Sequence, residues 1–395
     1  MYTIAHKGVL PPLSDEQRYE LMQEAPMHSL VQLLEAVPDP RGRHGLRYDL
    51  PFLLACLIAA VLANCNGSEA VAQWCREHQE LLRHWFGPRL FLTPSGSLYR
   101  WLLPQLCADS VERVLAAWVQ ATLVAAHDEA IALDGKAVRG AVSGEQDAPH
   151  LLAFCTHQSQ ETLLQAWVDE KTNEIPVAKS LVSQVPLAGR VCTADALHTH
   201  ADLMHLLHEL EAESILPVKD NQPRLRADLQ TYFADPLAHS VQASTTDRRR
   251  GRTEVRQIKV STEMTSYLSA TWPHVAQVAE LTRIVTRKGK TTQEIVYFIS
   301  SLTPDQASPQ RLLALVRGHW HIENRLHYVR DVDFGEDRSR LRSGNAPQIM
   351  AAVRNLVITL IHRSGSSQIA ASRRSFAYHP RQALALLFAK GGPQQ

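Results

Sequence analysis

The spacing of apolar residues changes character near residue 125. Before that point, apolar residues recur at helical intervals, as in MHSLVQLLEAV, where Leu30, Leu33 and Leu34 share one face. The run Pro51–Ala63 is apolar throughout and predicts a buried helix, and GSEAVAQWCREHQELLRHWFG, TPSGSLYRWLLPQL and SVERVLAAWVQATLVAAH predict further helices. We therefore expect an all-α region over residues 27–125, preceded by a flexible N-terminal arm over residues 1–26.

After residue 125 the pattern becomes one of short apolar or alternating runs, bounded by glycine and polar residues. These runs are EAIALDGKAV, HLLAFCTHQ, TLLQAWVDE, GRVCTADAL and AESILPVKD. Helical patterns lie between them, most clearly in HTHADLMHLLHEL. Three adjacent strands, followed by a helix, a strand, a helix and a strand, predict an α/β domain with a mixed sheet.

The segment from about 236 to 275 is polar and shows no clear element. VAQVAELTRIVTRKGKTTQEIVYFISSL then predicts a β-hairpin that turns at residues 288–290. A helix is expected from about Ser308 to Arg330, and a last long helix begins near Pro347. We expect residues 366–395 to form a weakly ordered C-terminal tail, apart from the short apolar stretch ALALLFA.

Composition excludes few classes of protein. The chain of 395 residues is 45% hydrophobic and 21% charged, which is typical of a globular protein. The net charge of +1 does not mark a bulk polycation, so docking to nucleic acid would depend on local basic clusters. The six cysteines form no C-x-x-C pair, which favours reduced thiols in a cytoplasmic protein. No apolar run reaches the about 20 residues that span a bilayer, so we expect no membrane partner.

Two aspartates follow buried strands of the α/β domain. Asp134 ends IALD before a glycine, and Asp195 follows the strand VCTA. Ligands of open α/β sheets bind at the carboxyl ends of strands, so both residues are candidates for shared chemistry. For either residue alone, capping of the next turn or helix is an equally ordinary explanation.

A third acid, Glu323, lies in the basic stretch HWHIENRLHYVRD. On an α-helix it would share a face with His319, His327 and Arg330, beside an apolar stripe formed by Leu315, Ile322, Leu326 and Val329. The helix could then bury the apolar stripe against the sheet and direct Glu323 along its carboxyl edge.

Three carboxylates that meet at one point repel one another unless a proton or a cation intervenes. Mg²⁺ accepts carboxylate oxygens and keeps part of its shell for water and phosphate. Two such ions about 3.5 to 4 Å apart can activate the attacking oxygen and stabilise the leaving oxygen in phosphodiester displacement. Asp134, Asp195 and Glu323 are thus suited to bind two Mg²⁺ or Mn²⁺ ions.

Several long motifs together resemble one family. They are DPRGRHGLRYDLPFLLACLIAAVLA, TPSGSLYRWL, IALDGKAVRG, KTNEIP, VCTADALHTH, LPVKDNQP, YFISSL, RGHWHIENRLHYVRDVDFGEDRSRLRSGNAP and VRNLVITLIH. Their order and spacing resemble the ISAs1-type DDE transposases, which include the H-repeat-associated proteins and are related to the IS4-type enzymes. The resemblance covers about residues 30–361.

The resemblance implies a ribonuclease-H-like catalytic core with a mixed sheet over residues 126–365, interrupted by an inserted subdomain at about 236–305. It also implies that the helical region before the core binds DNA and that Asp134, Asp195 and Glu323 form the catalytic, metal-binding triad. The related Tyr-Arg-Glu-Lys signature has its other three residues where this chain has Val316, His319 and Arg330. The implied partners are double-stranded DNA, both terminal inverted repeats and target, and a second copy of the chain. The implied location is the bacterial cytoplasm, on the nucleoid when DNA is bound.

Basic residues near the acids are candidates for contact with DNA phosphates, which supply most non-specific affinity. The alternative for each is a solvated polar surface. The candidate DNA-binding residues are His319, His327, Arg330, Arg248, Arg249, Arg250, Arg252, Arg338 and Arg340. Trp320 and Tyr328 could stack on an unpaired base, although such aromatics more often pack in a core or an interface. Zinc binding by His198, His200, His205 and His208 is disfavoured, since the leucine stripe already explains that helix.

These observations favour an insertion-sequence transposase that cleaves phosphodiester bonds at the element ends and transfers the freed 3′ hydroxyl to target DNA. Two alternatives remain. A catalytically silent or domesticated DNA-binding protein with the same fold would bind DNA without nicking it. A metal-dependent nuclease would cleave DNA without strand transfer, and a joining assay separates it from a transposase.

Overall fold

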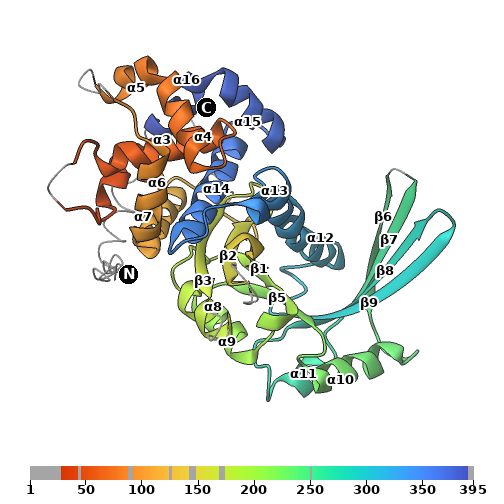
Figure 1. The fold of residues 1–395 in the computed structure, drawn as a ribbon. Coiled ribbons are helices and arrows are strands. Elements are labelled where there is room, and N and C mark those ends of the chain that lie inside the picture. Colours follow the sequence, from red (N-terminus) through yellow and green to blue (C-terminus); the bar gives the residue numbers. More distant parts are fainter. Residues whose placement is uncertain are drawn as a thin grey trace, which may run out of the picture.

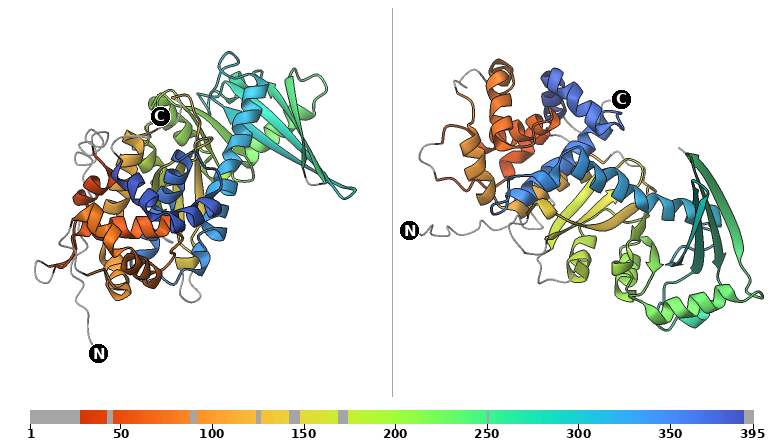
Figure 2. Two further views of the ribbon diagram at one scale, coloured as in Figure 1. Left: turned by 90° about the horizontal axis from the view of Figure 1, so that it is seen from above. Right: turned by 45° about the vertical axis from the view of Figure 1, so that its right-hand side comes forward.

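The computed structural model describes residues 28–42, 46–87, 92–123, 127–141, 148–168, 174–249 and 251–389. One nine-stranded sheet runs through the molecule, and helices cover both faces of its central strands (Figures 1 and 2). The predicted N-terminal arm over residues 1–26 lies outside the described residues.

The first five strands form the centre of the molecule in the order β3-β2-β1-β4-β5. Strand β2 is antiparallel to β1 and β3, whereas β4 is parallel to β1 and to β5. The strands are β1 (Ile131–Ala137), β2 (His150–Thr156), β3 (Thr162–Val168), β4 (Val191–Ala194) and β5 (Glu213–Val218). The predicted sequence of strands and helices is confirmed, and the mixed sheet has the expected ribonuclease-H-like arrangement.

The remaining four strands extend the same sheet as an arm, at the right of Figure 1. Strand β9 pairs antiparallel with β5, and β8, β7 and β6 follow outward in antiparallel order. The strands are β6 (Val241–Arg249), β7 (Arg252–Ser261), β8 (Gln277–Arg287) and β9 (Lys290–Ser300). The predicted hairpin is confirmed, because Arg287 pairs with Lys290 across its turn. The β6–β7 hairpin was not predicted, because much of its surface faces water and its sequence is polar.

The region before the sheet is helical, as its periodicity predicts. Its elements are α2 (Leu30–Leu33), η2 (Leu34–Ala36), α3 (Leu50–Leu62), α4 (Ser68–Glu77), α5 (Gln79–Phe86), α6 (Gly96–Leu102), η3 (Leu103–Gln105) and α7 (Ala108–Ala121). Of the thirteen residues of α3, all but Pro51 are buried, which confirms the predicted buried helix.

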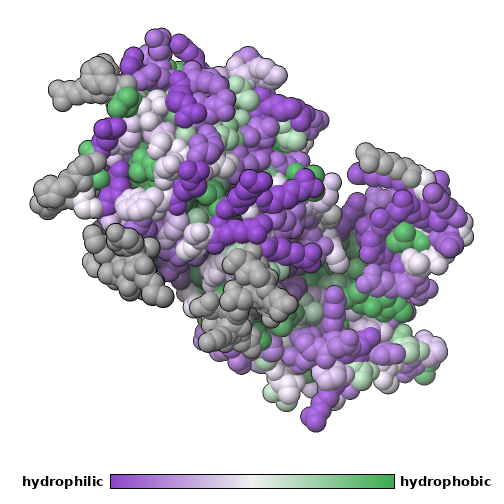
Figure 3. Space-filling view, viewed as in Figure 1, coloured by the Kyte–Doolittle hydropathy of each residue, from purple (hydrophilic) through white to green (hydrophobic). Residues whose placement is uncertain are grey.

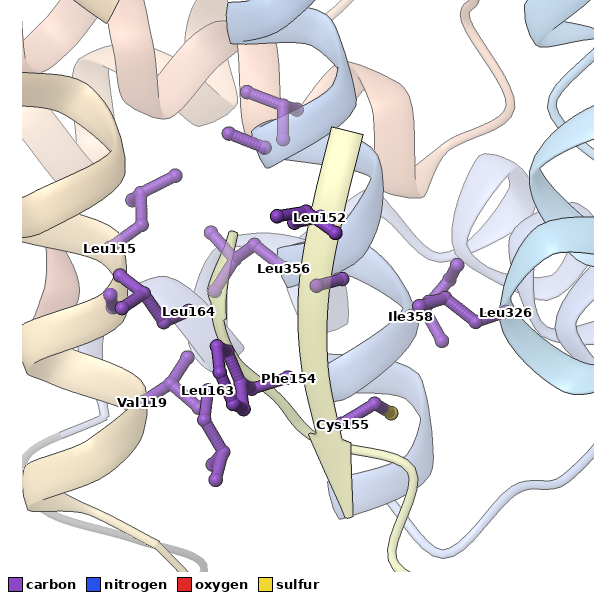
Figure 4. Packing of buried hydrophobic residues seen from close by; sticks show 14 of the residues in the cluster. Leu115, Val119, Leu152, Phe154, Cys155, Leu163, Leu164, Leu326, Leu356 and Ile358 are labelled. Carbon is purple, nitrogen blue, oxygen red and sulfur yellow. The ribbon is translucent and has the colours of Figure 1, made fainter. Parts of the chain in front are cut away.

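Helices within and after the sheet connect its strands and cover it. They are η4 (Arg139–Ala141), α8 (Glu174–Val182), η5 (Ala196–His198), α9 (Ala201–Glu209), α10 (Pro223–Ala234), α11 (Thr265–Leu268), α12 (Pro309–His321), η6 (Ile322–His327), α13 (Tyr328–Val332), η7 (Glu336–Arg338) and α14 (Ala346–Arg363). Helix α14 is the central one, since it packs against α3, α7 and β3. Figure 4 shows Leu326 of η6 and Ile358 of α14 directed toward one another. Both side chains are buried, so the core fixes the segment that carries Glu323.

The expectation of a weakly ordered tail after residue 365 was wrong for most of its described part. Residues 369–388 form α15 (Ile369–Tyr378) and α16 (Pro380–Phe388), which pack on α3. Arg373 is 1% exposed, donates to the carbonyl of Val61 and lies 3.9 Å from the centre of the Phe334 ring. The buried apolar residues of these helices complete the core of the N-terminal region.

The six cysteines are free thiols, and five of them are buried. The absence of a disulfide framework agrees with the spacing in the sequence. Within the described ranges, no helix is long and apolar enough to cross a lipid bilayer.

Candidate active site

Asp134 and Asp195 lie side by side on neighbouring parallel strands. The pairing between β1 and β4 ends with Leu133 opposite Ala194, and the two aspartates are the next residues on each strand. Adjacent strands are about 4.8 Å apart, and residues at matching positions project from the same face. Asp134 is still inside β1, which continues along β2 to Ala137. Asp195 also caps η5 by accepting a hydrogen bond from the amide of His198, so the capping interpretation holds for it as well.

Both aspartates border a cavity of about 590 Å³, and so does Glu323. The cavity lies between the strand ends of β4 and β5, helix α12 and the arm. Its remaining lining includes Thr193, Lys219, Arg252, Glu254, Arg256, Arg283, Glu294, Arg317, His319 and Trp320. Figure 3 shows the surface hollowed between the arm and the body of the molecule. Among the described residues, no three His, Cys, Asp or Glu side chains are close enough to hold one ion, so the three carboxylates share a cavity without already meeting at a point.

The helix that carries Glu323 is not a continuous α-helix, which corrects the predicted one. Helix α12 ends at His321, residues 322–327 form a π-helical turn, and α13 begins at Tyr328. Hydrogen bonds in a π turn span five residues instead of four, so positions beyond it rotate relative to the preceding helix. His319 and Glu323 both border the cavity, whereas Arg330, which lies beyond the π turn, is buried away from it. Glu323 is exposed and borders the cavity, whereas its neighbours Ile322 and Leu326 are buried.

The prediction that Arg330 binds DNA was wrong. Its side chain is fully buried and lies 2.8 Å from the carboxylate of Glu336, which also accepts from Arg354 at 2.8 Å. Lys136 of β1 pairs with Asp331 at 2.6 Å and completes this network. Glu336 of η7 therefore joins Arg330 of α13 to Arg354 of α14, and Lys136 joins β1 to α13.

The two predicted histidines lie at the site as neutral rings. His327 Nδ1 is 3.6 Å from Asp134 Oδ2. Burial, aided by the charges of Arg330 and Lys136, lowers the pKa of His327 to about 3. Burial also lowers the pKa of His319 to about 4, although nearby Asp195 acts in the opposite direction. At neutral pH neither ring can attract phosphate as a cation, but each can donate or accept a hydrogen bond.

The three arginines of the arm that border the cavity are already paired. Arg252, Arg256 and Arg283 contact Glu254 at 2.5 to 2.6 Å. These guanidinium groups override the effect of burial and hold the pKa of Glu254 below its usual range. Asp247 pairs with Arg256 at 2.9 Å and with Arg317 of α12 at 2.7 Å, which joins the arm to the helix that precedes Glu323. The predicted phosphate contact of Arg252 would therefore have to compete with Glu254.

The other predicted DNA-binding arginines lie outside the cavity lining. Arg248 and Arg249 are exposed at the end of β6, and within the described part of the chain neither takes part in an ion pair. Arg250 lies outside the described residues. Arg338 and Arg340 are exposed at and after η7. The candidate stacking residues Trp320 and Tyr328 are 47% and 60% exposed, and only Trp320 borders the cavity.

Two cavity residues were missed by the sequence analysis. Lys219 is exposed directly after β5, and Arg317 lies on α12, before the π turn that carries Glu323. Lys219 occupies the same place after its strand as Asp195 does after β4. The strand-end rule that selected the aspartates therefore also selects Lys219.

Two family models match this chain. A family model described as Transposase DDE domain matches residues 125–360, and one described as DDE_Tnp_1-associated matches residues 31–119. "Putative transposase YncI" of Escherichia coli O157:H7 is 25% identical over 345 residues, which cover 85% of this chain and 87% of that protein. "H repeat-associated putative transposase YhhI" of Escherichia coli K12 is 22% identical and covers 85% and 90%.

A solved structure of the piggyBac transposase synaptic complex with hairpin DNA aligns with 94% of this chain and 78% of its own. The identity is 12% and the TM-score is 0.42. The Transposase DDE domain model matches more than half of the 395 residues of this chain. The chain therefore belongs to the family of DNA transposases that carry this domain.

Proposed function

We propose that the chain hydrolyses a phosphodiester bond at each end of an insertion sequence and then directs the freed 3′ hydroxyl at target DNA. One observation carries this proposal. Asp134 and Asp195 occupy matching positions on adjacent parallel strands, and Glu323 borders the same cavity. Hydrolysis and strand transfer use the same in-line displacement at phosphorus, so one set of carboxylates can serve both.

The chemistry of these side chains fits divalent cations. All three donors are carboxylate oxygens, which Mg²⁺ and Mn²⁺ prefer, and no thiolate takes part. Asp195 and Glu323 are accessible from the cavity. We propose that Asp134, Asp195 and Glu323 hold two ions, which when bound would favour attack at phosphorus and stabilise the departing oxygen. Glu323 lies on a π turn, and such turns often occur at functional sites.

Residues around the carboxylates would bind and orient the DNA. Lys219 flanks the acids and would supply positive charge for a phosphate beside the scissile bond. Arg317 also borders the cavity, but a phosphate would have to compete with Asp247 for it. The arm, which lines the other side of the cavity from the acids, would contact the bound DNA strand from there. Transposition joins two element ends, so we propose that the chain acts at least as a dimer on double-stranded DNA.

The test of this function uses a supercoiled plasmid that carries the coding sequence with its native flanking DNA. We expect Mg²⁺-dependent cuts that leave 3′ hydroxyls at the element boundaries, followed by joined products when target DNA is added. Cleavage without joining would identify a nuclease. Binding without any cleavage in Mg²⁺ or Mn²⁺ would identify a catalytically silent protein and overturn the proposal.

Arg248 and Arg249 provide a prediction about DNA affinity. Replacing both with glutamine should weaken binding to the plasmid's end DNA about equally for all sequences, because phosphate contacts carry no base information. The dependence of log Kd on log salt concentration should become less steep by about 1.8, or about 0.9 for each lost contact. Fluorescence anisotropy at several salt concentrations measures both quantities.

The matched control replaces Arg374 and Arg381 with glutamine. These exposed residues of α15 and α16 give the same change in net charge away from β6. An identical salt dependence in the two double variants would contradict a specific role for Arg248 and Arg249.

A further inference from the structure

A buried hydroxyl joins the strand of Asp195 to the helix of Glu323. Thr193 of β4 is 2% exposed, and its Oγ1 lies 2.9 Å from His157 Nε2 and 3.0 Å from His319 Nδ1. Thr193 is two residues before Asp195 on the strand, and His319 is one turn before Glu323. This His-Thr-His chain of hydrogen bonds is therefore the short polar connection between the elements that carry the two acids.

His157 is a fixed anchor for this chain. It is 5% exposed, and its amide donates to the carbonyl of Ala130 at 2.9 Å. Its own carbonyl lies 2.9 Å from His321 Nδ1 at the end of α12. Gly318 packs directly on the ring, since a Cβ at that position would lie 2.3 Å from His157 Nδ1. The last turn of α12 thus rests on His157 and has no room for a larger residue at position 318.

The packing favours one direction for the hydrogen bonds. The side of Gly318 that carries a Cα hydrogen faces His157 Nδ1, and a lone pair fits this contact better than an N–H does, which favours the tautomer with the ring proton on Nε2. In that tautomer His157 Nε2–H donates to Thr193 Oγ1, which lies 2.9 Å away, and the Thr193 hydroxyl donates to His319 Nδ1 at 3.0 Å. The ring proton of His319 is consequently on Nε2. His319 borders the cavity of Asp134, Asp195 and Glu323, so this N–H is the donor that the ring has left for a ligand.

We propose that Thr193 and His157 are positioning residues that hold His319 as the Nε2–H tautomer, and that this N–H donates to a non-bridging oxygen of the scissile phosphate. The inference rests on the proposed function, because it assumes that the phosphate binds at these carboxylates. A neutral donor held in place binds the oxygen on which negative charge develops without needing to reorganise. The same hydrogen bonds hold α12 against β4 and so limit the movement of Glu323 relative to Asp195.

Two pairs of variants separate the roles. Thr193→Val removes the hydroxyl and keeps the shape, whereas Thr193→Ser keeps the hydroxyl. His319→Asn retains an amide near the Nδ1 position, whereas His319→Gln retains a donor near the Nε2 position. On the flanking-DNA plasmid under single-turnover conditions, Thr193→Val and His319→Asn should each slow cleavage by about 10-fold to 100-fold. Thr193→Ser should stay within about threefold of the unchanged protein, and His319→Gln should cleave faster than His319→Asn. The Kd for DNA should change by less than about twofold in the two Thr193 variants.

The tautomer is measured independently of activity on the whole chain labelled with ¹⁵N-histidine. Long-range ¹H–¹⁵N correlation spectra should show His157 and His319 as Nε2–H tautomers, and Thr193→Val should remove this preference at His319. An Nδ1–H tautomer at His319 would overturn the inference even if no cleavage were observed. Equal cleavage rates in Thr193→Val and Thr193→Ser would also overturn it. By contrast, undiminished cleavage by Asp195→Asn would overturn the proposed function itself.

Discussion

Asp134→Asn, Asp195→Asn and Glu323→Gln should each reduce Mg²⁺-dependent DNA cleavage by about three orders of magnitude or more. Each change keeps the size of the side chain and removes one negative charge from the shared cavity. A neutral amide binds Mg²⁺ more weakly than a carboxylate does, so an ion would be lost or displaced. The rate is measured as single-turnover nicking of the plasmid with native flanking DNA.

The folds of Asp195→Asn and Glu323→Gln should be unchanged, because Glu323 is exposed and Asp195 lies at the end of a strand. DNA affinity in the absence of divalent ions should also persist. Glu294→Gln is a matched control, since Glu294 borders the same cavity from the arm and we assign it no ion. Cleavage at the rate of the unchanged protein by any of the three variants would show that the replaced acid holds no essential ion.

The second large effect concerns stability. Glu336→Gln should lower the free energy of unfolding by about 3 to 5 kcal/mol, because it leaves the buried guanidinium groups of Arg330 and Arg354 without their counter-ion. Urea unfolding at pH 7 measures this change. Arg338→Gln is the control on the same short helix, and its exposed side chain predicts a change within about 0.5 kcal/mol.

The effect of Glu336 should depend on pH in a defined direction. Burial alone would raise the pKa of Glu336, but Arg330 and Arg354 override it and lower the pKa from 4.5 to about 2. A group with a depressed folded pKa stabilises the protein fully above its unfolded pKa, so the contribution of about 3 kcal/mol should be present above pH 4.5 and lost as the pH falls toward 2. The difference between the unchanged protein and Glu336→Gln should therefore shrink below pH 4.5. A difference that grew with acid would contradict this account of the buried network.

The sequence predicted the strands that carry Asp134 and Asp195, because strand periodicity is a local property. The parallel pairing of β1 with β4, which puts the two aspartates side by side, is seen in the structure. The sequence did not predict the buried position of Arg330. Helical spacing placed Arg330 beside Glu323, but a π turn and the buried partner Glu336 are set by packing of distant segments. Periodicity assumes a constant helical repeat, so it cannot anticipate where that repeat changes.

The contrast between local periodicity and the packing of distant segments also explains the other errors. Helices α15 and α16 are short, and their burial depends on contacts with α3, which lies some 300 residues away in the sequence. Thr193 has no feature that marks it in the sequence, since its role arises only when β4, α12 and the turn after β2 meet. Lys219, in contrast, was detectable, because it follows its strand as Asp195 does.

The central claim is that Asp134, Asp195 and Glu323 hold divalent ions at bound DNA, and counting those ions tests it most directly. Mn²⁺ can be titrated into the protein bound to DNA from the element's own ends and followed by electron paramagnetic resonance. We expect two tightly bound ions per active site in the unchanged protein and loss of at least one in Asp195→Asn. Equal numbers of bound ions in both proteins would contradict the claim.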